Sequence, residues 1–410
     1  MLALDVLAVL SAACWVVLAL GRNLFWLPRP RLPRPGPEPP PGRWPALAVV
    51  VPARDEAALL PTTLPTLLHQ DYPGRAVVVV VDDGSTDGTA EVARQLAAPP
   101  PPPDREPQDK ERLACVVVRT GDRPAGWAGK VWALAEGAAQ VPWATWLLFT
   151  DADIQHPPGS LRALVGLGES RGLDQVSVMA RLEATGWSGR LLVPAFVYFF
   201  AMLYPFRTVT GRSVRRAAAA GGCLLVRRAR LEAAGGLASV AGAVIDDVGL
   251  AKALARAGGR LWLGYDRGIR SVRPYPRLAD LWAMVRRSAY AQLRWSPAAL
   301  AGTVLAMALV FLVAPVAVVV GLLLPDTPAA VAGGLAWVIA TLTFLPLVLE
   351  EGVAWPWALG LPLAALLYLG MTLDSARQHR RGGPQWKGRA LPGPAAPQRP
   401  PHAANDRPGR

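Results

Sequence analysis

The chain has 410 residues, of which 52% are hydrophobic, and its formal net charge is +13. This length exceeds that of one ordinary domain, and the positive mean hydropathy of +0.26 indicates membrane segments rather than only a large core. The basic residues are mostly arginines that flank apolar segments, and no basic helix or base-stacking module accompanies them. We therefore expect contacts with anionic lipid headgroups and phosphate-bearing ligands, and no nucleic-acid partner.

The first apolar segment lies at the N-terminus. Residues 2–20 are broken only by Asp5, and they are long enough to cross a hydrocarbon layer of roughly 30 Å. A cleaved signal peptide would need basic residues ahead of this segment, whereas the arginines follow it. The sequence thus predicts an uncleaved transmembrane anchor at residues 1–20, a proline-rich linker at 28–45, and a following domain in the cytoplasm.

Residues 46–276 alternate between strand-like and helix-like segments. The predicted strands are 46–51, 76–81, 115–118 and 145–150, and the predicted helices between them are 57–68, 89–97 and 131–139. Because the strands are apolar on both faces, we predict an α/β fold with a mostly parallel, Rossmann-like sheet covered by helices. A proline-rich and charged stretch at 99–112 predicts a surface insertion.

Four pairs of carboxylates follow apolar segments of this region. They are Asp55 and Glu56, Asp82 and Asp83, Asp151 and Asp153, and Asp246 and Asp247. Acidic groups at such positions are costly unless a site uses their charge. Three of the pairs follow predicted strands, and ligands of open α/β sheets bind beyond the carboxyl ends of the strands. The sequence therefore predicts one acidic site at this edge of the sheet.

Two of the pairs indicate particular ligands. Asp151 and Asp153 are two residues apart, so in an extended segment they project to the same side and can hold one Mg²⁺ or Mn²⁺ ion. The adjacent Asp82 and Asp83 repel each other and need hydrogen-bond donors, such as those of a base or a ribose. In the same turn, Asp87 is expected only to cap the next helix.

Three further apolar segments occur near the C-terminus, at about 298–324, 329–349 and 354–373, followed by a basic, proline-rich tail at 374–410. Together with the anchor, three spans would place the tail opposite the cytoplasmic domain. Arg377, Arg380 and Arg381 favour the cytoplasmic side instead. Either one of the three segments is re-entrant or interfacial, or the tail is translocated despite its charge.

Two other segments are expected at the bilayer surface. Residues 277–296 predict an interfacial amphipathic helix, and Arg294 and Trp295 at its end either close a donor pocket or anchor the helix. The aromatic segment 191–206 is short for a span and is interrupted by Pro194 and Pro205. It is expected to form an apolar wall that admits a lipid, or a plain core element.

The motifs VPARDE, VDDGSTDG, TDAD and IDDVGLA occur in this order, together with GWAGKVWAL, RPYP and WKGR. In this respect the chain resembles the membrane-bound family 2 glycosyltransferases of the GT-A type, and most of all the bacterial hopene-associated glycosyltransferases. The resemblance implies a GT-A nucleotide-sugar-binding domain at the cytoplasmic face of the bacterial inner membrane. The implied reaction is inverting transfer of a sugar from a nucleotide-sugar donor to a membrane lipid, a hopanoid or another polyprenoid alcohol.

The resemblance also implies roles for individual residues. Glu56 and Asp83 would contact the donor nucleoside, Asp151 and Asp153 would address its diphosphate through the metal, and Lys130 would neutralise phosphate charge. Without the resemblance, a solvated lysine at the start of a helix would be a nearly equally good interpretation of Lys130. The third acidic motif is usually Glu-Asp in the family and is Asp246-Asp247 here, which places the general base at Asp247. The complete predicted donor-binding set is Asp55, Glu56, Asp82, Asp83, Lys130, Asp151, Arg294 and Trp295.

Two alternatives remain from the sequence. A processive polysaccharide synthase of the same family commonly has a QxxRW motif, and the Gln-Leu-Arg-Trp at 292–295 is one residue shorter. A catalytically silent membrane scaffold would have no need of the intact acidic residues. Both observations favour transfer of a single sugar to a lipid.

Overall fold

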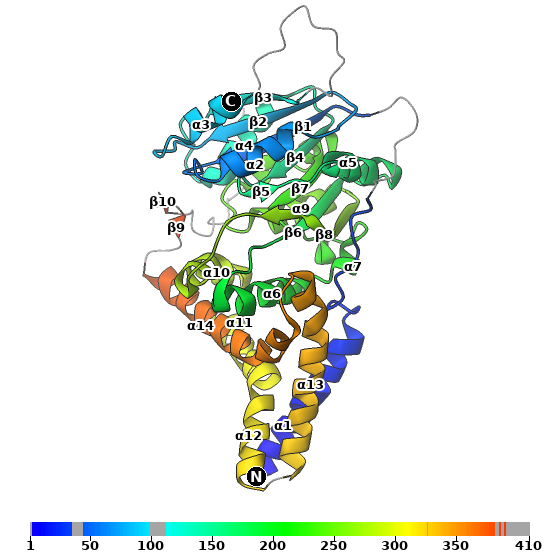
Figure 1. Cartoon of the computed structure of the whole chain (residues 1–410), viewed down its shortest axis with the longest axis vertical. Helices are drawn as coiled ribbons and strands as arrows, with labels where there is room; N and C mark the ends of the chain where they lie inside the picture. The colour runs from blue at the N-terminus through cyan, green and yellow to red at the C-terminus, as the bar shows by residue number, and fades with distance from the viewer. Residues whose placement is uncertain are drawn as a thin grey trace, which may run out of the picture.

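The computed structural model describes residues 2–34, 44–97, 112–325, 327–381, 385–386 and 389–390. A domain with a central sheet lies above a long helical stalk, and several helices lie between the two (Figure 1). Half of the predicted linker, and most of the predicted insertion and tail, fall outside the described residues.

The sheet has eight strands in the order β3-β2-β1-β4-β7-β6-β8-β5. The strands β1 to β4, β6 and β8 each run parallel to at least one neighbour, whereas β7 is antiparallel to β4 and β6, and β5 is antiparallel to β8. The predicted mostly parallel α/β sheet is thereby confirmed. The strands are β1 (Leu47–Ala53), β2 (Ala76–Asp82), β3 (Ala114–Arg119), β4 (Trp146–Thr150), β5 (Ile154–Gln155), β6 (Gln175–Arg181), β7 (Cys223–Arg227) and β8 (Leu261–Ser271).

The alternation of side chains along β1 divides the core between the two faces of the sheet. Val50 packs with α4 (Gly129–Ala139) and α9 (Asp246–Arg256), whereas Val49 packs with α2 (Leu60–Leu68), α3 (Thr89–Leu96) and α5 (Ser160–Ser170). Both valines are fully buried. Helices therefore cover both faces, as expected for strands that are apolar on both sides.

The helix predicted from residue 57 begins only at Leu60. The backbone N–H of Ala57 donates to the carboxylate of Asp87 at 3.0 Å, which holds the preceding residues in a loop. Pro61 then occupies the first turn of α2, where its missing N–H is not needed. The other carboxylate oxygen of Asp87 accepts from the N–H of Thr89, the first residue of α3, at 3.0 Å. The N-cap position itself is Gly88, so Asp87 contacts the start of the helix from one residue before the cap.

Three helices lie between the domain and the stalk: α6 (Gly186–Leu203), α10 (Leu278–Gln292) and α14 (Leu361–Arg380). The expected interruption at Pro194 is wrong, because α6 continues through this residue and ends before Pro205. In α14, the Asp374 carboxylate accepts from Trp282 Nε1 of α10 at 2.8 Å, and the Tyr368 hydroxyl donates to the Leu192 carbonyl of α6 at 2.9 Å. The last apolar segment is thus packed along the underside of the domain (Figure 1).

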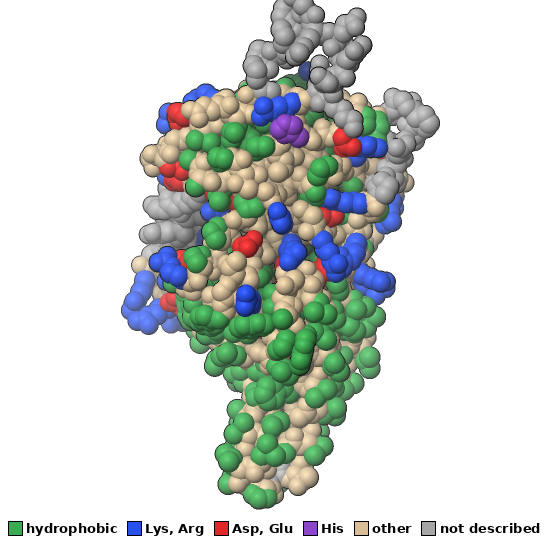
Figure 2. Space-filling model, viewed as in Figure 1, with side chains coloured by type: hydrophobic (Ala, Val, Ile, Leu, Met, Phe, Trp, Pro, Cys, Tyr) green, Lys and Arg blue, Asp and Glu red, His purple; other side chains and the backbone are tan. Residues whose placement is uncertain are grey.

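The stalk consists of α1 (Leu2–Gly21), α11 (Pro297–Met307), α12 (Val313–Leu323) and α13 (Thr327–Glu350). A π-helical turn, Ala308–Leu312, joins α11 to α12, and the carbonyl of Val310 in this turn accepts a hydrogen bond from Trp15 Nε1 at 2.7 Å. Hydrophobic side chains cover the stalk, and Lys and Arg side chains gather where it meets the domain (Figure 2). In the described part of the chain, five helical segments are long and apolar enough to span a membrane.

Candidate active site

A cavity of about 700 Å³ lies beyond the carboxyl ends of β1, β2 and β4. Its upper part is lined by acidic residues and a lysine, and its lower part by side chains of α6, α10 and α14. Seven of the predicted site residues line it: Glu56, Asp83, Lys130, Asp151, Asp153, Asp246 and Asp247. Members of all four acidic pairs and the lysine thus meet in one space, as predicted for the three pairs that follow strands.

Asp247 lies at the start of α9 and is held by backbone donors. Its Oδ2 accepts from the N–H of Gly221 at 2.8 Å, and its Oδ1 accepts from the N–H of Val248 at 2.7 Å. A Cβ atom on Gly221 would lie 3.2 Å from Asp247 Oδ2 and 3.3 Å from Lys130 Nζ. A Cβ atom at residue 221 would therefore crowd Asp247 and Lys130, which favours glycine at this position.

The environment of Asp247 raises its pKa to about 7. Burial is the main cause, followed by the adjacent charge of Asp246, while Lys130 and the two backbone donors oppose the shift. A carboxylate with a pKa near neutrality can accept a proton during a reaction at physiological pH. Asp247 therefore has the protonation behaviour of a general base.

Lys130, at the start of α4, lies between carboxylates. Its Nζ is 2.7 Å from Asp151 Oδ1 and 3.9 Å from Asp246 Oδ2. Burial alone would lower the pKa of Lys130, but the charges of Asp151 and Asp246 outweigh this effect and raise it. Lys130 therefore stays protonated, and it connects the DxD motif to the acidic pair of α9.

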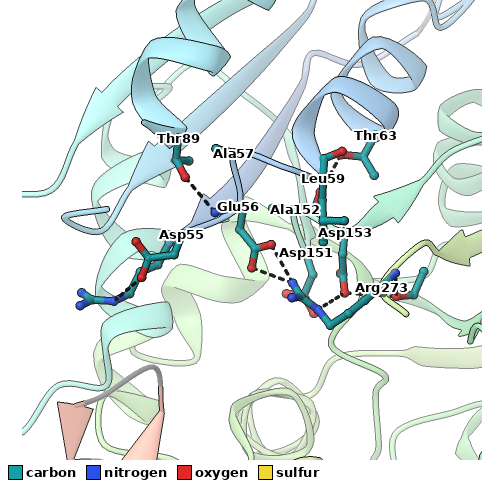
Figure 3. A network of polar contacts seen from close by, with 12 residues as sticks. Asp55, Glu56, Ala57, Leu59, Thr63, Thr89, Asp151, Ala152, Asp153 and Arg273 are labelled. Atoms are coloured by element: carbon teal, nitrogen blue, oxygen red, sulfur yellow. Dashed lines mark hydrogen bonds and ion pairs between the residues drawn. The ribbon is translucent and has the colours of Figure 1, made fainter. Parts of the chain in front are cut away.

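Asp153 is engaged by an arginine that comes much later in the chain. Its Oδ2 accepts hydrogen bonds from Arg273 Nε at 2.8 Å and from Ser271 Oγ at 3.1 Å. The Nη2 of the same arginine donates to both oxygens of Glu56, at 2.7 and 2.8 Å. Figure 3 shows Arg273 between Glu56 and Asp153, with Asp151 beside them. One guanidinium thus joins two of the predicted acidic motifs.

The chemistry of this site suits a divalent cation. Burial, and next the charge of Asp151, raise the pKa of Asp153, so the two carboxylates of the DxD motif repel each other. The cavity lining contains seven carboxylates against four cationic side chains, an excess that a bound cation would offset. Among the described residues, no group of three or more His, Cys, Asp or Glu side chains is arranged to hold a metal alone. Phosphate oxygens of a ligand would have to supply the remaining positions.

Two of the predicted donor-binding residues, Asp55 and Asp82, do not line the cavity. Asp55 adopts a positive φ of 50°, and its carboxylate accepts from the N–H of Thr86 at 2.9 Å. Asp82 is 2% exposed, and its carboxylate accepts from the N–H of Ser85 at 3.1 Å. Both carboxylates order the turn after β2, and the Asp55 side chain points away from Arg273 (Figure 3).

Arg294 and Trp295 also lie outside the cavity lining. Both have a positive φ, 53° and 60°, in the connection between α10 and α11. The Trp295 ring stacks on the ring of His379 in α14, with 4.2 Å between the ring centroids. Of the two roles left open by the sequence, this contact supports anchoring of the helix end for Trp295.

Sequence reasoning did not identify several residues of the cavity lining as site residues. They are Arg54, Arg273, Tyr275 and Arg287 in the polar part. Phe196, Phe199 and Phe200 in the apolar part belong to the segment 191–206, for which an apolar wall was one of the two expectations. Arg273 and Tyr275 belong to RPYP, one of the motifs on which the resemblance to the family rests. A single arginine, in contrast, carries little information before its spatial neighbours are known.

A family model described as glycosyltransferase like family 2 matches residues 45–296. No curated protein sequence matches the chain. The mannosyltransferase PcManGT from Pyrobaculum calidifontis, solved in complex with GDP-Man and Mn²⁺, has a similar structure. It is 20% identical, with a TM-score of 0.50, over 92% of this chain and 99% of that chain.

Two other solved structures resemble the domain more distantly. Glucosyl-3-phosphoglycerate synthase from Mycobacterium tuberculosis is 20% identical, with a TM-score of 0.37, over 61% of this chain and 79% of that chain. The S. aureus TarS fragment 1–349 is 17% identical, with a TM-score of 0.36, over 60% of this chain and 64% of that chain. Because the family model alone covers more than half of the sequence, the chain belongs to the family 2 glycosyltransferases.

Proposed function

We propose that this family 2 glycosyltransferase is an inverting enzyme that transfers one sugar from a nucleotide-sugar donor to the hydroxyl group of a membrane lipid. The observation that carries the proposal is the continuity of the cavity. The same space is lined by the acidic residues at the strand ends and by aromatic side chains of α6, next to the apolar stalk. A soluble acceptor would have no need of such an apolar end.

The acidic part of the cavity is suited to the donor. Glu56 and Asp83 offer carboxylate oxygens to the hydroxyl and N–H groups of a nucleoside, and both are more than nine-tenths buried. Asp151 and Asp153 would hold Mg²⁺ or Mn²⁺, which would stabilise the negative charge of the departing diphosphate. PcManGT was solved with GDP-Man and Mn²⁺, which supports the same ligand chemistry here.

Asp247 is the proposed general base. In the proposed step, the acceptor oxygen forms a bond to the anomeric carbon, the bond from this carbon to the diphosphate breaks, and the acceptor proton moves to Asp247. The backbone donors of Gly221 and Val248 hold the carboxylate in place for this transfer. Burial, and next the charge of Asp246, raise the pKa of Asp247 to about 7, which lets it accept the proton.

The apolar part of the cavity is suited to a lipid chain. It is lined by Phe196, Phe199 and Phe200 of α6, Met284 of α10 and Tyr368 of α14. Large apolar surfaces rimmed by polar groups are typical of sites that bind apolar ligands. We propose a polyprenoid alcohol, such as a hopanoid, as the acceptor, with its hydroxyl at Asp247 and its hydrocarbon between α6 and α10.

The arrangement of the helices supports a definite membrane topology. We propose that α1, the α11–α12 segment and α13 cross the bacterial inner membrane, while α14 lies along its cytoplasmic surface. One face of α14 packs on the domain, and the opposite face exposes Leu363, Leu366 and Leu373 by about half. Three spans place the domain and the basic tail on the same side, which agrees with the preference of basic residues for the cytoplasm.

The experiment that tests this function uses the full-length protein in native lipid. A panel of nucleotide sugars is supplied with Mn²⁺ or Mg²⁺, and both the released nucleoside diphosphate and the masses of the lipids are measured. Vesicles of defined composition, with and without a hopanoid alcohol, then identify the acceptor. The metal-free protein and the Asp247→Asn variant serve as controls.

A mass increment of a single sugar on one lipid is the expected result, and it would name both substrates. A ladder of increasing sugar number would instead indicate a processive synthase. Absence of donor turnover with the native lipid present would contradict glycosyltransfer and favour a silent scaffold.

A further inference from the structure

Four cationic side chains line the cavity: Arg54, Lys130, Arg273 and Arg287. The first three are neutralised by carboxylates: Arg54 Nη1 is 3.9 Å from Asp83 Oδ2, Lys130 Nζ is 2.7 Å from Asp151 Oδ1, and Arg273 bonds to two carboxylates. For Arg287 the described part of the chain contains no ion pair or hydrogen bond. Arg287 is therefore the cation of this cavity whose charge has no protein counterpart there.

The position of Arg287 on α10 directs it into the cavity. Its neighbour Arg286 turns to the other side, where its Nη1 is 3.4 Å from the Asp374 carboxylate of α14. Asp280 and Met284, which lie seven and three residues before Arg287, line the same cavity and so share its face of the helix. Asp280 does not neutralise Arg287, because its carboxylate bonds to Arg277 at 2.9 Å.

Arg287 lines the same cavity as the DxD motif and the apolar wall. Asp153, Arg273 and Tyr275 are also part of this lining. Met284, Ser288 and Ala289 continue the lining from α10 towards the apolar end. Arg287 thus stands where the polar and apolar parts of the cavity meet.

The side chain of Arg287 is partly exposed at the cavity wall, and the planar set of donors of a guanidinium matches phosphate oxygens. We propose that Arg287 binds a phosphate group of a substrate in this cavity, in a bidentate manner. The inference rests on the proposed glycosyltransfer and makes it more specific. The phosphate comes either from the diphosphate of the donor or from a lipid monophosphate that serves as the acceptor, and the two sources can be separated by experiment.

The test compares the full-length wild type with the Arg287→Gln and Arg286→Gln variants in lipid nanodiscs. Binding of UDP and GDP in Mn²⁺ is measured by calorimetry, with uridine and guanosine as probes that lack phosphate. Binding of farnesyl monophosphate and farnesol is measured by quenching of tryptophan fluorescence. Arg286→Gln removes the same charge from the same helix outside the cavity. Arg287→Lys keeps the charge but loses the planar fork.

Arg287→Gln is expected to weaken binding of one phosphate probe about ten- to hundredfold, because a hydrogen bond to a charged group is lost. The matched phosphate-free probe should be unaffected, and Arg287→Lys should recover part of the loss. A loss confined to UDP or GDP assigns Arg287 to the donor, and a loss confined to farnesyl monophosphate assigns it to the acceptor.

Equal affinities of wild type and Arg287→Gln for every phosphate probe that the wild type binds would overturn the inference while leaving glycosyltransfer intact. The same holds if Arg286→Gln produces an equal loss. A wild-type protein that binds neither kind of phosphate probe would overturn both proposals. Unfolding midpoints of all variants, measured in the same nanodiscs, show whether a loss of binding reflects a loss of folding.

Discussion

The replacement of Asp247 by asparagine tests the proposed general base directly. Asparagine has nearly the same shape, but it cannot accept a proton at neutral pH. In the wild type, Asp247 accepts from two backbone N–H groups through its two oxygens. Asparagine has a single acceptor oxygen, so either Gly221 or Val248 loses its partner.

The two consequences have different magnitudes. Loss of general-base catalysis is expected to lower kcat by about 10²- to 10⁴-fold, which corresponds to a rise of roughly 3 to 5 kcal/mol in the activation free energy. The unpaired backbone N–H costs about 1 to 3 kcal/mol of folding stability. Donor affinity should stay within about threefold of the wild type, because the proposed nucleotide and metal contacts are at other residues.

The assay combines initial rates of lipid glycosylation, donor binding by calorimetry, and thermal unfolding of the same preparations. A folded Asp247→Asn protein that binds donor and transfers no sugar is the expected outcome. Retention of more than a tenth of the wild-type kcat would show that another group takes the proton. Loss of donor binding together with transfer would show that Asp247 belongs to the donor site instead.

Four further predictions concern the same cluster. The value of kcat/KM should fall below about pH 7 as Asp247 becomes protonated. Asp246→Asn should move this acidic limb of the pH profile to lower pH, because it removes a charge that raises the pKa of Asp247. An unchanged limb would contradict the assignment of the limb to Asp247. The same raised pKa predicts that the contribution of Asp247 to folding stability is largest below about pH 4 and is lost as the pH rises through about 7. Unfolding midpoints of the wild type and Asp247→Asn, measured across this pH range, test this prediction. Gly221→Ala should lower kcat at least tenfold, because the new Cβ would lie 3.2 Å from Asp247 Oδ2. In Gly222→Ala the new Cβ meets an apolar side chain at 3.3 Å, so this variant should lower kcat less when the two variants are equally stable. Asp153→Ala should weaken donor binding and remove its dependence on Mn²⁺, and unaltered Mn²⁺-dependent affinity would rule out its role as a metal ligand.

The sequence predicted the elements well where local patterns dominate. Apolar segments of five to seven residues became the strands β1, β2 and β4, and most helix bounds lie within a few residues of those expected. The three acidic motifs that follow β1, β2 and β4 converged because positions at the carboxyl ends of parallel strands follow from the fold class. Pro194 misled the prediction, since the helix α6 tolerates it within a tightly packed core.

The partners of the site residues were decided by tertiary structure. Arg273 lies 120 residues after Asp153 in the chain, and nothing in the local sequence of either one predicts their ion pair. The same limit applies to the adjacent Asp82 and Asp83, of which one turns to the loop and the other to the cavity. Which of two neighbouring carboxylates faces the ligand depends on the exact register of the strand end, which an apolar pattern does not specify.

The sequence by itself determined the α/β class, the acidic character of the site and the number of apolar segments, because periodicity and hydrophobic length are local properties. Only the tertiary structure decided that α14 packs beneath the domain instead of joining the stalk, and that Arg287 meets no acidic partner among the described residues. Both facts depend on contacts between segments that are far apart in the chain, since packing and charge pairing are settled only when those segments come together in space.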